Sequence, residues 1–208
     1  RLISMVSEQE QQRLQEIRTG IDALDAQIQQ LIAERAKLAQ EVAHIKTQGG
    51  TVETIFYRPE REAQVLREVM HRNQGPLADD VVARLFREIM SACLALEQPV
   101  RVAYLGPEGT FSQAATIKHF GLSAQTLAVA NIENVFKAVE TGRTDYGVVP
   151  VENSTEGAVN ITQDLLLKTN LQVCGEVNLS IHHALLAKTT ELTSIKVVAA
   201  HAQALAQC

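Results

Sequence analysis

The sequence predicts an α plus α/β protein, with an all-helical domain in residues 1–98 and an α/β domain in residues 99–208. Two observations carry this prediction. In the first part, apolar residues recur three and four positions apart, which is the spacing of amphipathic helices. After Pro99, short β-type runs alternate with helical stretches, which is typical of a layered α/β fold with a mostly parallel sheet.

The first helix is expected from about Glu8 to Lys46, and the pair Gly49-Gly50 is a strong stop. Its apolar stripe is formed by Leu14, Ile17, Ile21, Leu24, Ile28, Leu31, Leu38, Val42 and Ile45. Arg35 stands in this stripe where the next apolar residue is due. A guanidinium in a core position is costly without an anionic partner, and no Asp or Glu of the stripe supplies one. We therefore expect a ligand to pair with Arg35.

The length of this helix predicts a second copy of the chain. About 39 residues at ~1.5 Å each make a rod of roughly 58 Å, about twice the diameter of a small domain. Two shorter helices cannot cover such a rod alone. The sequence therefore predicts an intertwined, antiparallel homodimer.

Three cationic side chains of the first helix are candidate ligand contacts. Arg35 and Lys46 are close to three turns apart, so they project from one face with Cα atoms roughly 16 Å apart, a spacing suited to a small dianion. Arg18 lies roughly 25 Å from Arg35 along the axis and would reach the ligand of the partner subunit. Each cation also has an ordinary explanation. Lys46 suits the dipole of the last turn, Arg35 can snorkel from the stripe edge, and Arg18 can be a surface cation.

Two more helices are expected before Pro99. Pro59 suits the first turn of the second helix, and the turn at residues 73–76 ends it. Asp79 or Asp80 is expected to cap the third helix. The apolar face of the second helix is formed by Val65, Leu66 and Val69. The third helix has its stripe at Val82, Leu85, Phe86, Ile89, Cys93 and Leu96.

The α/β part contains alternating elements. The expected strands are 100–105, 127–130, 146–151, one or two within 171–188, and 196–200. The expected helices are 112–120, 132–140 and 159–168.

Composition excludes several classes of protein. A net charge of -5 does not favour nucleic acid or an anionic membrane as a partner. No apolar run approaches the roughly 18 residues of a membrane span. Three widely spaced cysteines fit a reducing compartment, so a cytoplasmic location is expected. The pair His182-His183 has no metal partner at useful spacing, and no metal or other cofactor is expected.

At the cations, the helical part resembles the chorismate mutases of the all-helical class. The matching pieces are Arg18, residues 21–25, residues 31–35, Lys46, and residues 61–62. The α/β part resembles the prephenate dehydratases. Its matching pieces are residues 104–112, 149–154, Gly157 and 164–166. This order resembles the bifunctional chorismate mutase–prephenate dehydratase family, the P-proteins of phenylalanine biosynthesis.

The resemblance to the mutases implies the rearrangement of chorismate to prephenate, which needs no nucleophile and no proton transfer. The protein has to hold a compact conformer and stabilise the charge that develops on the ether oxygen. By resemblance, Arg35 and Arg18 of the partner subunit bind carboxylates, and Lys46 contacts the ether oxygen and a carboxylate. Arg61 supports the site or contacts the ligand, although it also fits a solvated face. Glu62 accepts the ring hydroxyl.

Three positions depart from the family pattern. Arg58 stands where some members have an Asp that is proposed to contact the ring hydroxyl. That contact is absent here, so the hydroxyl depends more on Glu62. Cys93 stands where some members have Ser, and a buried small residue is the other explanation for it.

Glu97 replaces a Gln that faces the ether oxygen. A Glu donates a hydrogen bond only when it is protonated, a form that burial favours. We expect mutase activity to fall as Glu97 loses its proton with rising pH, and Glu97→Gln to flatten that profile; a flat wild-type profile would contradict this. The alternative is an exposed Glu at a helix end.

The resemblance to the dehydratases implies the first part of a two-lobed, periplasmic-binding-protein-like α/β domain with its active site between the lobes. The implied cleft residues are Glu152, Asn153, Ser154, His201 and Gln207. Turn and cap chemistry is the other explanation of residues 152–154. Ala200 and Ala202 replace the Ser and Pro that usually flank the histidine.

The Thr-Arg-Phe motif and the regulatory region of the family are absent from the sequence. We therefore expect an N-terminal portion with a complete mutase, an inactive dehydratase and a poorly stable α/β part. The alternative function is a non-catalytic module that binds a small acid and is dimerised by its helices.

Overall fold

A computed structural model of the chain describes residues 8–48, 57–153, 157–200 and 204–205, with the side chains of 46–48 left out. Contacts between Cα atoms divide the chain into two compact units, Arg1–Pro99 and Val100–Cys208. The first unit is helical and the second is built around a parallel sheet, which confirms the predicted fold class. None of the helices in the described ranges combines the length and the apolar content that a membrane crossing requires.

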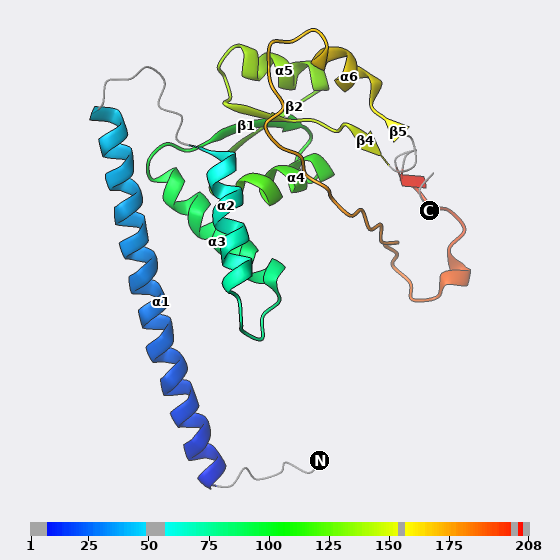
Figure 1. Cartoon of the computed structure of the whole chain (residues 1–208). Coiled ribbons are helices and arrows are strands. Elements are labelled where there is room, and N and C mark those ends of the chain that lie inside the picture. Colours follow the sequence, from blue (N-terminus) through cyan, green and yellow to red (C-terminus); the bar gives the residue numbers. More distant parts are fainter. Residues whose placement is uncertain (1–7, 49–56, 154–156, 201–203, 206–208) are drawn as a thin grey trace. The chain divides into compact units, whose positions relative to one another are not determined.

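The helical unit consists of α1 (Glu8–Gln48), α2 (Pro59–Arg72) and α3 (Asp79–Ala95), as Figure 1 shows. The three helices begin and end close to the predicted residues. Helix α1 runs unbroken over 41 residues. Pro59 occupies the first turn of α2, where its missing N–H has no intrahelical partner to lose.

Helices α2 and α3 form an antiparallel hairpin that packs through buried Leu66 and Val69 of α2 and buried Ala83 of α3. The predicted cap of α3 is wrong. The N-cap residue is Ala78, and no side chain caps the helix. Asp79 is instead part of the turn, because its carboxylate accepts a hydrogen bond of 2.7 Å from the Asn73 amide, which also donates to the Leu77 carbonyl at 2.8 Å.

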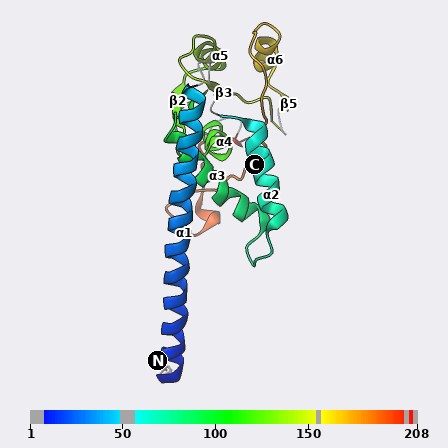
Figure 2. The ribbon, with the colours of Figure 1, turned by 60° about the vertical axis from the view of Figure 1, so that its left-hand side comes forward.

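Helix α1 packs against α3, and the two helices lie side by side in Figure 2. The described α1 residues that are half-buried are Arg35, Ala36, Ala39 and Ala43. Alanines let two helix backbones approach closely. The apolar stripe faces elsewhere and stays exposed in the single chain, with Leu24 58% and Leu31 63% exposed. Parts of the α3 stripe are exposed as well, including Leu85 and Leu96.

The α/β unit is built on three parallel strands in the order β2-β1-β3. They are β1 (Arg101–Leu105), β2 (Gln125–Val129) and β3 (Tyr146–Val148). Helix α4 (Phe111–Phe120) covers one face of the sheet and α5 (Ile132–Glu140) covers the other, as both views show (Figures 1 and 2). After β3 the chain adds a short antiparallel pair, β4 (Glu152–Asn153) with β5 (Gly157–Ala158), and helix α6 (Asn160–Leu166).

The core lies on both faces of the central strand β1, whose side chains alternate between them. Ala103 packs on the α5 side with Val135 and Ala138. On the α4 side, the rings of Phe120 and Tyr146 have centroids 5.3 Å apart.

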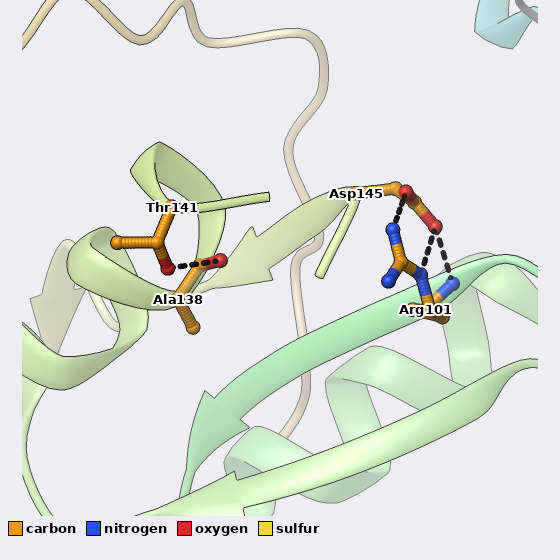
Figure 3. A network of polar contacts seen from close by, with 4 residues as sticks. All are labelled: Arg101, Ala138, Thr141 and Asp145. Carbon is orange, nitrogen blue, oxygen red and sulfur yellow. Dashed lines mark hydrogen bonds and ion pairs between the residues drawn. The ribbon is translucent and has the colours of Figure 1, made fainter. Parts of the chain in front are cut away.

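A bidentate ion pair ties the start of β1 to the residue before β3 (Figure 3). The Arg101 guanidinium donates to both Asp145 carboxylate oxygens, at 2.7 and 3.2 Å, and the Arg101 backbone N–H donates to the same carboxylate at 2.9 Å. These contacts align the two strands at the edge opposite the loops described below.

The strands expected within 171–188 and at 196–200 are absent from the described residues there. A strand needs a hydrogen-bonded neighbour. The described residues of this stretch have none, and many of its apolar side chains are exposed, such as Leu186 at 91% and Val197 at 83%. The only regular element described between residues 167 and 200 is a 3₁₀ turn, η1 (Leu192–Ser194). Strand β3 also ends before residue 151, close to Pro150, which lacks a backbone donor for the sheet.

Candidate functional site

The first turn of α2 gathers three of the predicted site residues. Arg58 is the exposed N-cap residue. Arg61 is exposed, and its guanidinium donates to the Gln64 side-chain oxygen at 2.8 Å along the same helix. Glu62 follows it and turns toward α3 instead of solvent.

Glu62 forms an ion pair with Arg87 of α3. The Arg87 Nε donates to Glu62 Oε1 at 3.1 Å, and the Arg87 and Glu62 side chains are 26% and 18% exposed. Sequence reasoning missed Arg87. The available signal was the hairpin itself, because Glu62 lies one turn before Leu66 and Arg87 one turn after Ala83. Two antiparallel helices that pair Leu66 with Ala83 bring these charges face to face.

The cations of α1 lie on one unbroken helix. Arg35 is half-buried, at the boundary between the exposed stripe and the alanine face. Arg18 is exposed and stays roughly 25 Å away along the axis, so one chain does not bring the two guanidinium groups together. Lys46 is in the last turn of α1, and its side chain lies outside the described residues.

The remaining mutase candidates are at the end of α3. Cys93 is buried. Glu97 is half-buried, and its backbone N–H donates to the Leu94 carbonyl at 3.0 Å just beyond the helix. The helical unit thus carries candidate cations on α1 and candidate carboxylates on α2 and after α3.

The α/β unit presents a second candidate site at the carboxyl ends of β1 and β3. From the central strand β1 the chain passes through α4 to β2 on one side, and from β2 it returns through α5 past β1 to β3 on the other side. Ligands of open α/β sheets bind outside the carboxyl ends of the parallel strands. Residues 106–110 follow β1 here, and residues 149–153 follow β3.

Backbone geometry holds the loop after β1 against the sheet. The Gly106 N–H donates to the Val129 carbonyl at 2.8 Å, and a Cβ at Gly106 would lie 3.1 Å from Ala128 Cβ. Gly109 has a φ of 81°, which favours glycine. Thr110 caps α4 by accepting from the Gln113 N–H. Burial, and then the nearby Glu108 carboxylate, raise the pKa of Tyr104 at the base of this loop.

The segment after β3 leads into β4, in which Glu152 is exposed and Asn153 is half-buried. The Thr162 hydroxyl of α6 donates to the Pro150 carbonyl at 2.7 Å and anchors the loop. The other three predicted cleft residues, Ser154, His201 and Gln207, lie outside the described residues. A hollow of about 340 Å³ beside β2 and α5 is lined by none of the predicted site residues.

Comparison with known proteins identifies both parts of the chain. Residues 102–208 match the family model of prephenate dehydratase, and residues 17–98 match that of chorismate mutase type II. The chain belongs to the prephenate dehydratase family and has a type II chorismate mutase domain ahead of that region.

The curated relatives carry both of these names. The chain is 57% identical over 202 residues to the bifunctional chorismate mutase/prephenate dehydratase of Stutzerimonas stutzeri, and 55% identical to that of Pseudomonas aeruginosa. Each match covers 96% of this chain and 55% of the relative, so the chain spans about half the length of these relatives. Among solved structures, a chorismate mutase (Form II) from Thermus thermophilus is 35% identical, and the match covers 41% of this chain and 94% of that one, with a TM-score of 0.38.

Proposed function

We propose that the helical domain predicted in residues 1–98 catalyses the rearrangement of chorismate to prephenate. The observation that carries the proposal is the charge pattern of α1, where Arg35 interrupts an apolar stripe at a half-buried position and Lys46 follows close to three turns later. The match of residues 17–98 to the chorismate mutase type II model and the names of the curated relatives support it.

The proposed mechanism needs only binding and electrostatics. Chorismate is a dianion, and Arg35 together with Arg18 of the partner subunit would bind its carboxylates and hold a compact, reactive conformer. Lys46 would donate to the ether oxygen as the carbon–oxygen bond breaks and negative charge develops there. Glu97 would act as a second donor there when it is protonated.

The α2 and α3 residues complete the proposed pocket. Glu62 would accept the ring hydroxyl of chorismate, with Arg61 and Arg58 adding positive charge beside it. Cys93 would line the pocket as a small buried residue.

A homodimer is part of the proposal. The stripe residues of α1 are about half exposed or more, and exposed apolar surface of this extent marks an interaction site. A second α1 packed against the stripe would bury these side chains. It would also bring Arg18 of the partner subunit toward the Arg35 end of the first helix, a distance that one chain alone does not span.

For the α/β domain predicted in residues 99–208, we propose a contribution to prephenate dehydration, which yields phenylpyruvate in phenylalanine biosynthesis. Its cleft residues would be Glu152, Asn153, Ser154, His201 and Gln207, at the carboxyl ends of the parallel strands. The cytoplasmic location, supported by the sparse cysteines, is a proposal as well.

A chorismate assay tests the mutase proposal. The purified chain should consume chorismate and form prephenate, and Arg35→Ala should lower kcat/KM by about 100-fold or more, because one preorganised charge contact is lost. Arg13→Ala, an exposed cation near the start of the same helix, is the control and should match the wild type.

The assay also separates the alternative function. A chain that binds chorismate without consuming it, with Arg35→Ala reducing only binding, would favour the non-catalytic small-acid module. Failure of the wild type both to bind and to convert chorismate would overturn the proposed function.

A further inference from the structure

We propose that Arg87 is a positioning residue of the mutase site, which holds the Glu62 carboxylate so that its second oxygen accepts the ring hydroxyl of chorismate. The inference rests on the proposed function and adds a residue to it. It begins from the ion pair between α2 and α3, in which Arg87 Nε lies 3.1 Å from Glu62 Oε1.

The contact uses one carboxylate oxygen and leaves the other available. In the described part of the chain, Glu62 makes no side-chain hydrogen bond or ion pair besides the one with Arg87. A carboxylate has lone pairs on both oxygens, so Oε2 keeps its capacity to accept from a hydroxyl while Oε1 is held.

The packing of two helices sets the position of this pair. Leu66 and Val69 of α2 are buried against α3, and Glu62 continues the same face one turn earlier. Arg87 continues the face of buried Ala83 one turn later. The planar guanidinium presents its donors in a rigid fork, so an arginine here restricts the carboxylate more than a flexible ammonium group would.

A neighbouring pair on α3 provides the comparison. Arg84 Nη2 lies 3.7 Å from Asp80, and these side chains are 67% and 76% exposed, so this pair is a surface contact with little effect on either partner. Arg84 and Arg87 are both ion-paired arginines of one helix. They differ in burial and in the carboxylate they bind, which makes Arg84 the matched control.

The test compares chorismate with an analogue that lacks the ring hydroxyl. Arg87→Gln should lower kcat/KM for chorismate by about tenfold and leave kcat/KM for the analogue at the wild-type value, because only the hydroxyl contact depends on a positioned Glu62. Arg87→Lys should recover part of the loss. Arg84→Gln should match the wild type on both substrates.

A double variant completes the test. If Arg87 acts through Glu62, the Glu62→Gln/Arg87→Gln variant should be no slower than Glu62→Gln alone, since coupled residues are non-additive. An equal loss on chorismate and on the analogue would overturn the proposal and leave Arg87 a purely structural role, and no loss on either would overturn it as well.

Two controls keep these outcomes distinct. If Arg87→Gln does not fold, Arg87→Lys is measured in its place. A lower kcat/KM for chorismate alone then supports the proposal. An equal loss on both substrates, or no loss on either, overturns it. Wild-type turnover of chorismate separates the two proposals. Turnover without the hydroxyl-dependent effect overturns only the role of Arg87, whereas absence of turnover overturns the mutase function and this inference together.

Discussion

At the scale of single residues, the Arg101–Asp145 pair is the most complete polar contact of the α/β unit. Burial alone would raise the pKa of the Asp145 carboxyl. The hydrogen bonds from the Arg101 side chain and backbone, and then its charge, outweigh burial and lower this pKa below the ordinary value. The folded state therefore binds fewer protons at Asp145 than the unfolded state does. This stabilisation is present above the unfolded pKa and is lost as the pH falls through the folded one.

This sign predicts the behaviour of Asp145→Asn. The variant should lower the free energy of unfolding by about 1 kcal/mol near neutral pH, a modest value because the pair is partly exposed. The difference from the wild type should shrink as the pH falls below the pKa of the unfolded carboxyl, and should be lost once the pH passes the lower pKa of the folded state. Urea denaturation followed by circular dichroism measures both values. Asp164→Asn, at an exposed residue of α6, is the control, and a pH-independent difference for Asp145→Asn would contradict the prediction.

Single residues also show which contacts cannot be predicted from the sequence alone. Arg35 could be singled out because it breaks a local pattern, and that pattern lies within one helix. Arg87 breaks no pattern. Its pairing with Glu62 depends on the register between two helices, which depends on how the turn at residues 73–78 is built, and that turn differs from the predicted one in using Asp79 as a hydrogen-bond acceptor.

At the scale of elements, α5 approaches β3 so closely that Gly147 has no room for a side chain. A Cβ there would lie 2.7 Å from Val135 Cγ1 and 3.1 Å from Val139 Cγ2. Gly147→Ala should therefore lower the free energy of unfolding of the α/β unit by about 1–3 kcal/mol through overpacking. Urea denaturation measures the loss.

A second-site variant checks the cause of that loss. Val135→Ala removes the methyl group that a Cβ at residue 147 would strike, so Gly147→Ala/Val135→Ala should be less destabilised than the sum of the two single changes. Gly75→Ala, where a new Cβ would meet its nearest neighbour at 3.7 Å, should stay near the wild type. Additive losses would show that steric conflict with Val135 is not the reason.

The elements also divide into those that sequence predicts well and those that it does not. Helices α1, α2 and α5 agree closely with their predicted ranges, because their hydrogen bonds and apolar periodicity are local. The β-type pattern within 171–188 forms no strand, because a strand also requires a neighbour that local sequence does not provide. The alanine face of α1 was missed for another reason. Ala36, Ala39 and Ala43 are too small to stand out beside the large residues of the exposed stripe.

At the scale of the whole molecule, the proposed dimer makes each mutase site a shared property of two chains. Arg18 and Arg35 lie on one rigid helix and roughly 25 Å apart, so they would serve different sites unless another chain supplies the missing cation. The exposed stripe between them, from Ile21 to Leu31, is the surface on which the second α1 would lie. If two chains share each site in this way, a chain that lacks Arg18 and a chain that lacks Arg35 should complement each other in a mixed dimer.

Co-expression of Arg18→Ala and Arg35→Ala chains tests this consequence. Each variant alone should lose most activity, since every site lacks one carboxylate contact. In a mixed dimer, one site receives Arg35 from the first chain and Arg18 from the second and is intact, while the other site lacks both. Random pairing makes half of the dimers mixed, so about a quarter of the wild-type activity should return.

The control replaces the Arg35→Ala chain with the double variant Arg18→Ala/Arg35→Ala. No chain then supplies Arg18, so no site is complete and activity should stay at the level of the single variants. Differently tagged chains allow the mixed dimer to be purified and its activity measured directly, with about half of the wild-type value expected because one of two sites is intact. If the purified mixed dimer is no more active than the single variants, Arg18 and Arg35 do not meet across two chains. If the co-expressed chains form no dimer, the exposed stripe of α1 is not a surface for a second copy.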